Sequence, residues 1–215
     1  MTTPYTQNVR DNILPLSNAQ TLPAAFKEWQ FTGNTIDHEK PIEQCQLCNQ
    51  EDLRYHFEIQ NFYTHAKLMV GSQCILKFQI AVYDKGILLD KSDARKKLNK
   101  LTKEMHFRYC IKALLSLAQK EDDDRLFNAL IFYERNRFLT PKYANLVLWK
   151  LNLNKIDHNP AFFKINLAKP KYKEAISAME SFKIKRIWPA LTSSQRKLVE
   201  SLRKTPYQEA VVSKI

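Results

Sequence analysis

Three cysteines are the residues of this sequence whose type and spacing are best suited to chemistry. Cys45 and Cys48 are separated by two residues in the stretch CQLC, and Cys74 follows in the stretch VGSQC. Two cysteines at this spacing let one tight turn present both sulfurs to a single ion, and zinc prefers thiolate and imidazole ligands in a tetrahedron. In a reducing compartment such a pair more often binds metal than forms a disulfide. The spacing therefore predicts a zinc site with Cys45, Cys48 and Cys74 as three of its ligands.

The fourth ligand is left open by the spacing. We favour His56, because the alternation of residues 53–61 places it off the apolar face of a strand. The alternatives are His38 just before the cysteine pair, His65 in the turn that follows the strand, and Cys110, which sits in an apolar helical stretch typical of a core cysteine. Two further alternatives are an incomplete site and three cysteines that are simply buried as small hydrophobic residues.

The pattern around the cysteines argues against a catalytic metal. Zinc deaminases place His-x-Glu ahead of Pro-Cys-x-x-Cys, whereas His38 and Glu39 are adjacent in this chain. Three thiolates are electron-rich and reduce the Lewis acidity of the ion on which metal-assisted catalysis depends. The three glycines stand alone at positions 33, 71 and 86, so the sequence contains no glycine-rich phosphate loop. We therefore expect a structural metal and a protein that is not an enzyme.

The stretches CQLCNQEDLRYHFEIQN and LMVGSQCILKF resemble a short cysteine motif that recurs in uncharacterised bacterial and phage proteins. The motif reads C-x-L-C, then a strand that begins [IL]-R-Y, then V-G-x-x-C, and Cys45, Cys48 and Cys74 match its cysteines. The resemblance implies a small zinc-binding fold, similar to a zinc knuckle with a β-hairpin, and carries no known reaction. Some proteins with this motif have a histidine three residues after the last cysteine, where this chain has Lys77.

The elements around the cysteines are expected to be a helix, a loop and a β-hairpin. Residues 21–30 read as a helix with Thr21 as its N-cap, and the segment that follows reads as a loop. Apolar and polar residues alternate over 53–61, which predicts a half-buried strand, and residues 66–74 read as its partner. Gly71 would allow a sharp turn that aims Cys74 at the pair.

Helical periodicity dominates the chain after residue 84. Residues 91–119 have apolar residues at helical spacing, and the acidic run at 121–124 suits the start of the next helix. Thr140 before Pro141 predicts another helix start, and Thr192 with Gln195 predicts a capping box. Residues 169–191 read as one amphipathic helix. The fold class we predict is α+β: a small zinc-stapled β-hairpin module with an N-terminal extension over residues 1–84, then a mainly α-helical basic domain over residues 85–215.

The positive charge of the chain lies in its second part. Residues 1–84 hold 6 Lys and Arg against 9 Asp and Glu, whereas residues 85–215 hold 28 against 13. Such an asymmetry favours an anionic partner, nucleic acid first, bound through its phosphates. The two predicted patches of DNA- or RNA-binding residues are Lys96, Lys97, Lys100 and Lys103, and Lys185, Arg186, Arg196 and Lys197. The alternatives are a solvated surface and a protein partner docked on Trp149, Phe162, Phe163 and Trp188.

The composition is that of a folded protein without a membrane segment. Of the 215 residues, 44% are hydrophobic and 11% aromatic, and no apolar run approaches the roughly 18 residues that cross a bilayer. The first residues lack the basic and then apolar pattern of a secretion signal. We therefore expect a cytoplasmic accessory protein, of phage or mobile-element type by its cysteine motif, that binds zinc and nucleic acid.

Overall fold

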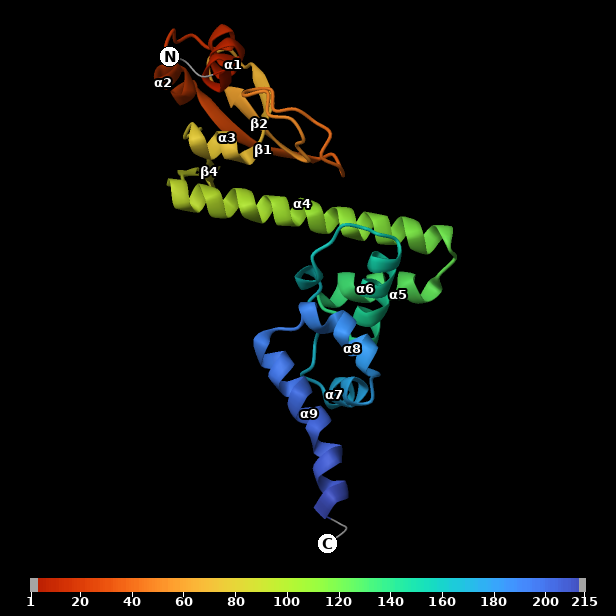
Figure 1. Cartoon of the computed structure of the whole chain (residues 1–215). Coiled ribbons are helices and arrows are strands. Elements are labelled where there is room, and N and C mark those ends of the chain that lie inside the picture. Colours follow the sequence, from red (N-terminus) through yellow and green to blue (C-terminus); the bar gives the residue numbers. More distant parts are fainter. Residues whose placement is uncertain (1–3, 213–215) are drawn as a thin grey trace. The chain divides into compact units, whose positions relative to one another are not determined.

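The computed structural model describes residues 4–212 and the side chains of residues 5–203. It divides into two compact units, residues 1–106 and residues 107–215, shown in Figure 1. The division falls inside the long helix α4 (Lys91–Lys120), whereas the sequence predicted a boundary at residue 84. The physical reason is that the first half of α4 contributes Ala94, Leu98 and Met105 to the core of the first unit. The architecture is α+β, as predicted.

The first unit contains a three-stranded antiparallel sheet in the order β1-β2-β3. The strands are β1 (Trp29–Asp37), β2 (Tyr55–Asn61) and β3 (Lys67–Val70). The predicted hairpin is confirmed, because β2 pairs with β3 with Phe57 opposite Val70 and Ile59 opposite Leu68.

Strand β1 was predicted to be the end of a helix and a loop, and this prediction was wrong. The helix α2 ends at Ala25 and a 3-10 turn, η2 (Phe26–Glu28), leads directly into the strand. The residues Thr32, Gly33 and Asn34 are typical of a turn in sequence. In the structure, Gly33 has a positive φ of 97° and lies where the register between β1 and β2 shifts. A bulge of this kind interrupts the alternation by which strands are recognised.

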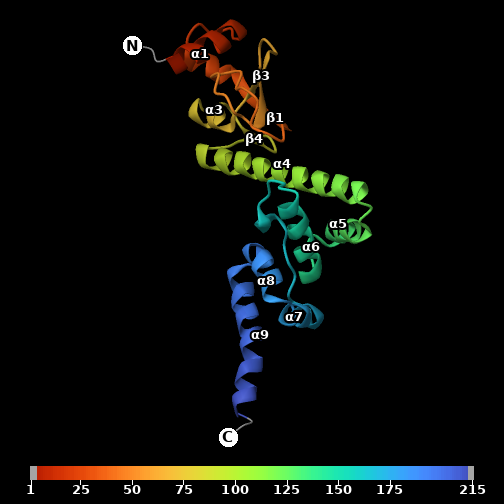
Figure 2. The same ribbon diagram turned by 45° about the vertical axis from the view of Figure 1, so that its right-hand side comes forward.

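Short helices and one further hairpin complete the first unit. They are α1 (Pro4–Ile13), η1 (Leu14–Leu16), α2 (Leu22–Ala25) and α3 (Ser72–Lys77), with the small strands β4 (Tyr83–Asp84) and β5 (Ile87–Leu88). Helices α1 and α3 lie beside the sheet in both views (Figures 1 and 2). Val9 from α1, Ile75 from α3 and Trp29, Phe57 and Ile59 from the strands share one core with the cysteines.

The second unit is helical. It contains the end of α4, then α5 (Asp124–Asn136), α6 (Pro141–Leu153), η3 (Pro160–Phe162), α7 (Pro170–Ser177), α8 (Ser181–Ile187), η4 (Trp188–Ala190) and α9 (Ser193–Val212). Its core includes Leu114, Leu126, Leu148 and Phe163, each essentially inaccessible to solvent. Among the described residues, no helix combines the length and apolar character needed to cross a bilayer.

The predicted helix starts of the second unit are confirmed by their hydrogen bonds. The side chain of Asp123 accepts from the backbone N–H of Leu126 at the start of α5, as the acidic run suggested. Thr140 caps α6 by accepting from the N–H of Tyr143. Thr192 and Gln195 form the reciprocal pair of a capping box at α9, with N···O distances of 3.0 and 3.3 Å.

The single helix predicted over residues 169–191 is instead two helices, α7 and α8. The chain leaves helical geometry after Ser177, and the N–H of Ala178 closes α7 on the carbonyl of Glu174. Glu180 is extended, with ψ 142°, before α8 begins. Met179 between them is buried in the core, so both helices contribute to one apolar stripe although the backbone is broken.

Candidate metal centre

Cys45 and Cys48 lie in a tight turn that is closed by backbone hydrogen bonds. The N–H of Asn49 donates to the carbonyl of Cys45, and the N–H of Cys45 donates to the carbonyl of Gln50. Asn49 takes a positive φ of 59°, which asparagine tolerates better than most residues. The turn is tied to the edge of the sheet, because Gln46 exchanges two hydrogen bonds with the backbone of Met69 in β3. Both sulfurs of the pair are thus presented from one side of the turn.

Cys74 reaches the pair from the first turn of α3 and not from the end of a strand. Gly71 is the N-cap residue of this helix, with φ −74° and ψ 150°. The sharp turn that was predicted to require its conformational freedom is therefore absent. A Cβ atom at Gly71 would meet Cδ1 of Leu53 at 3.3 Å, so close packing explains the glycine better than backbone conformation does.

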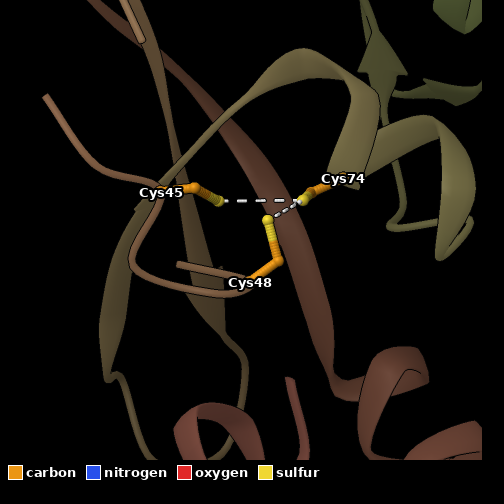
Figure 3. Close-up of side chains that lie close together, drawn as sticks. All are labelled: Cys45, Cys48 and Cys74. Carbon is orange, nitrogen blue, oxygen red and sulfur yellow. Dashed lines mark hydrogen bonds between the residues drawn. The ribbon is translucent and has the colours of Figure 1, made fainter. Parts of the chain in front are cut away.

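The three sulfurs converge on one point (Figure 3). Sγ of Cys74 lies 3.7 Å from Sγ of Cys45 and 3.3 Å from Sγ of Cys48. Ligands held at about 2.3 Å from a tetrahedral zinc ion are about 3.8 Å apart, so the spacing is close to that of a metal site. The cysteines are free of disulfides and are 0%, 6% and 5% exposed in chain order. The structure therefore brings together the three cysteines as a group that can hold a metal ion.

The electrostatics of the cluster favour the thiolate form at Cys45 and disfavour it at Cys74. The hydrogen bond with Cys74, helped by the backbone N–H groups of Gly71, Cys48 and Leu47, lowers the pKa of Cys45 to about 5. The same hydrogen bond, together with burial, raises the pKa of Cys74. Metal binding would displace any thiol proton in the cluster, since only thiolates are effective ligands.

Tyr5 lies against the cysteines, and no pattern in the sequence indicated this position. Its hydroxyl is 4.0 Å from Sγ of Cys74, although the two residues are 69 positions apart. Burial, followed by the proximity of the sulfurs of Cys74 and Cys48, raises the pKa of Tyr5. Lys77 lies one helical turn after Cys74, and its ammonium sits 3.7 Å above the centre of the Tyr5 ring. Lys77 thus positions the phenol beside the cluster.

The structure does not bring His56 among the cysteines. Neighbouring Phe57 faces the core that contains them, and side chains alternate along a strand, so His56 faces away. Its Nδ1 lies 3.1 Å from Nε2 of His38, whose Nδ1 is 3.6 Å from a carboxylate oxygen of Glu43. His56 is 4% exposed, and burial, followed by the charge of His38, lowers its pKa.

His38, His65 and Cys110, the remaining candidates for the fourth ligand, also lie outside the cluster. Within the described residues, no group of three or more His, Cys, Asp and Glu side chains that fits a metal ion includes any of them. Cys110 belongs to the second unit, where its Sγ is 3.4 Å from the carbonyl of Asp157 and its side chain is buried in the core. The interpretation of Cys110 as a core residue is confirmed.

Most lysines of the first basic patch form ion pairs. Lys96 pairs with Asp93, Lys97 with Asp84, and Lys100 with Glu104. These residues and Lys103 belong to the first unit by its compact contacts, not to the helical unit that follows.

The second patch lies on α8 and α9. Lys185 and Lys197 are exposed, whereas Arg186 donates to Asn145 and Arg196 donates to the carbonyl of Trp188. Phe163 was predicted to be one of the aromatic residues on which a protein partner docks. This prediction was wrong, because Phe163 is 0% exposed and lies in the core.

The comparisons with known proteins found no relative from which the roles of residues could be assigned to this site. The assignment of the cysteine cluster therefore rests on its own geometry. No protein-family model, no curated protein and no solved structure matches the chain.

Proposed function

We propose that the chain is a zinc-binding protein whose metal stabilises the first unit and whose second unit binds nucleic acid. The observation that carries the metal proposal is the convergence of three buried sulfurs from two separate segments, with sulfur separations of 3.3 and 3.7 Å. An ion bound there would connect the turn at 45–48 to α3, and the binding free energy of a structural zinc is folding free energy. The role proposed for the metal is structural, and no reaction is proposed.

Metal content measured on purified protein tests the metal centre. We expect one zinc ion per chain in the wild type and none in Cys48→Ser, because a two-cysteine remainder loses most of the affinity. Cys110→Ser is the matched control, since Cys110 is equally buried but lies in the other unit. It should retain the metal. A wild-type protein without metal, or a Cys48→Ser variant that binds it in full, would contradict the assignment.

The proposal of nucleic-acid binding rests on the distribution of charge between the two units. Residues 107–215 hold 21 Lys and Arg against 10 Asp and Glu, whereas residues 1–106 hold 13 against 12. The excess of positive charge is thus almost entirely in the helical unit. Polyanions are the partners that such an excess attracts, and the attraction supplies most of the affinity of sequence-tolerant binding.

The surface of α8, η4 and the start of α9 combines cations with one exposed and one partly buried aromatic ring. Phe182 is 57% exposed, and the cationic groups of Lys183 and Arg186 lie 5.5 and 5.9 Å from the centre of its ring. The guanidinium of Arg196 lies 5.7 Å from the ring centre of Trp188. Proteins that bind single strands combine basic grooves with rings on which bases stack, so this surface suits a single-stranded nucleic acid.

Fluorescence anisotropy with a labelled single-stranded oligonucleotide at several salt concentrations tests this function. We expect the double variant Lys185→Glu with Lys197→Glu to bind more weakly and to show a shallower salt dependence, by about 0.7 in the logarithmic slope for each phosphate that the protein no longer neutralises. The matched control is Lys96→Glu with Lys100→Glu, because both lysines already pair with carboxylates. It should leave binding nearly unchanged. The absence of wild-type binding at low salt would contradict the proposal and favour the protein partner.

A further inference from the structure

The cysteine cluster borders a pocket. The pocket has a volume of about 640 Å³, and all three cysteines line it together with Tyr5, Arg54 and Lys77. Lys77 and Gln73 at its border are exposed to solvent, whereas the cysteines are buried. An ion held by the three sulfurs would therefore be reachable from solution on the side of the pocket.

The described side chains provide this ion with three ligands, all of them cysteine sulfurs. Cys45, Cys48 and Cys74 are the members of the cluster, and among the described residues no His, Asp, Glu or fourth Cys joins them within the 4.8 Å that relates their ligand atoms. The hydroxyl of Tyr5 lies close to the cluster, 4.0 Å from Sγ of Cys74. Zinc sites with three protein ligands and one open position bind water or another exogenous ligand in that position.

We propose, building on the metal centre proposed above, that the fourth coordination position is open to this pocket and takes an exchangeable small monodentate anion in place of water. Two features of the pocket fit such a ligand. The Tyr5 hydroxyl is placed to donate a hydrogen bond to it, and the Lys77 ammonium, 3.7 Å above the Tyr5 ring, offsets the negative charge that three thiolates leave on the site. Arg54 is already engaged by Asp37 through two hydrogen bonds, so Lys77 is the cation assigned this role.

Substitution of cobalt for zinc tests the open position, with azide as the probe. Thiolate-to-cobalt charge-transfer absorption reports the number of sulfur ligands, and the ligand-field bands report the whole coordination sphere. We expect azide to shift the ligand-field bands of the wild-type protein in a saturable way while the charge-transfer intensity remains that of three thiolates. Ligand-field bands that do not respond to azide would overturn the proposal.

Two tyrosine variants test the role of Tyr5. Tyr5→Phe keeps the ring under Lys77 and removes the hydroxyl, so we expect it to bind cobalt and to bind azide several-fold more weakly, as the loss of one hydrogen bond to an anion predicts. Tyr63→Phe is the matched control, because Tyr63 is 66% exposed and does not line the pocket. Its azide titration should superimpose on that of the wild type.

Two further results would show that a protein side chain closes the site. The first is a tyrosinate difference spectrum that appears on addition of zinc and is lost in Tyr5→Phe, since it would make Tyr5 the ligand. The second is a changed ligand-field spectrum in His56→Gln. A wild-type protein that binds no cobalt would contradict the metal centre itself, whereas cobalt that is bound but insensitive to azide contradicts only the open position.

Discussion

Glu28 shows how a single buried carboxylate organises the N-terminal part of the first unit. It is 8% exposed and accepts hydrogen bonds from the backbone N–H groups of Asn18 and Ala19 and from the side chain of Asn61. Asn61 in turn accepts from the backbone of Tyr63 and Thr64, which shapes the turn between β2 and β3. The carboxylate thus connects the segment before α2 to the hairpin.

The pH dependence of stability should report this carboxylate. The hydrogen bond from Asn61 and those from the backbone hold the pKa of Glu28 below its usual range. A folded-state pKa below the unfolded value means that the contribution is present at neutral pH and declines once the pH falls below about 4.3. We expect Glu28→Gln to lower the free energy of unfolding in urea at pH 7, by an amount that shrinks as the pH falls.

The exposed Glu51 supplies the control for this measurement. Glu51→Gln should leave the stability near that of the wild type at each pH. If the wild type and Glu28→Gln differ by the same amount at pH 7 and at pH 3.5, the carboxylate does not contribute in the way its hydrogen bonds indicate.

The residues of the candidate site that lie close together in the sequence could be predicted from it. Cys45 and Cys48 share one turn, and in a reducing compartment two cysteines at this spacing more often bind metal than form a disulfide. Tyr5 was not predictable, because only the packing of α1 against α3 brings it to the cluster. His56 was correctly predicted to point away from the apolar face of its strand. The alternation of apolar and polar residues does not reveal that His38 contacts His56 on that other face.

At the scale of elements, helix starts were better predicted than strands. Caps are decided by residues three positions apart, as at Thr140 and Thr192, so the sequence contains the whole signal. Strand β1 depends on partner residues 18 or more positions away, and Phe31 pairs with Ile59 while the register shifts before Thr35. The break between α7 and α8 is also non-local, because buried Met179 continues the apolar periodicity across it.

The cap at α6 permits a direct comparison of two threonines in N-cap positions. Thr140 accepts a hydrogen bond from the N–H of Tyr143, whereas Thr21 caps α2 without any side-chain hydrogen bond. We expect Thr140→Ala to lower the free energy of unfolding by about 1 kcal/mol, since the N–H of Tyr143 loses its partner. Thr21→Ala should have little effect. Urea unfolding followed by circular dichroism makes the comparison, and equal effects of the two substitutions would contradict it.

At the scale of the whole molecule, the helix α4 contributes buried residues to two hydrophobic cores. Residues of α4 up to Met105 belong to the core that contains the cysteine cluster, and Cys110, Leu114 and Ala118 belong to the other. The two cores have no buried residue in common. A metal bound by Cys45, Cys48 and Cys74 is therefore expected to act on the stability of one core and to leave the other largely as it is.

Amide hydrogen exchange with and without a chelator measures this separation. Because the proposed metal connects the turn at 45–48 to α3, its removal should raise the exchange rates of β2, β3 and α3, which share the core of the cysteines. The amides of α5 and α6 should exchange at unchanged rates. Cys48→Ser should reproduce the effect of the chelator, and adding the chelator to this variant should then change nothing. An equal rise in both units would mean that the metal stabilises the chain as one cooperative body.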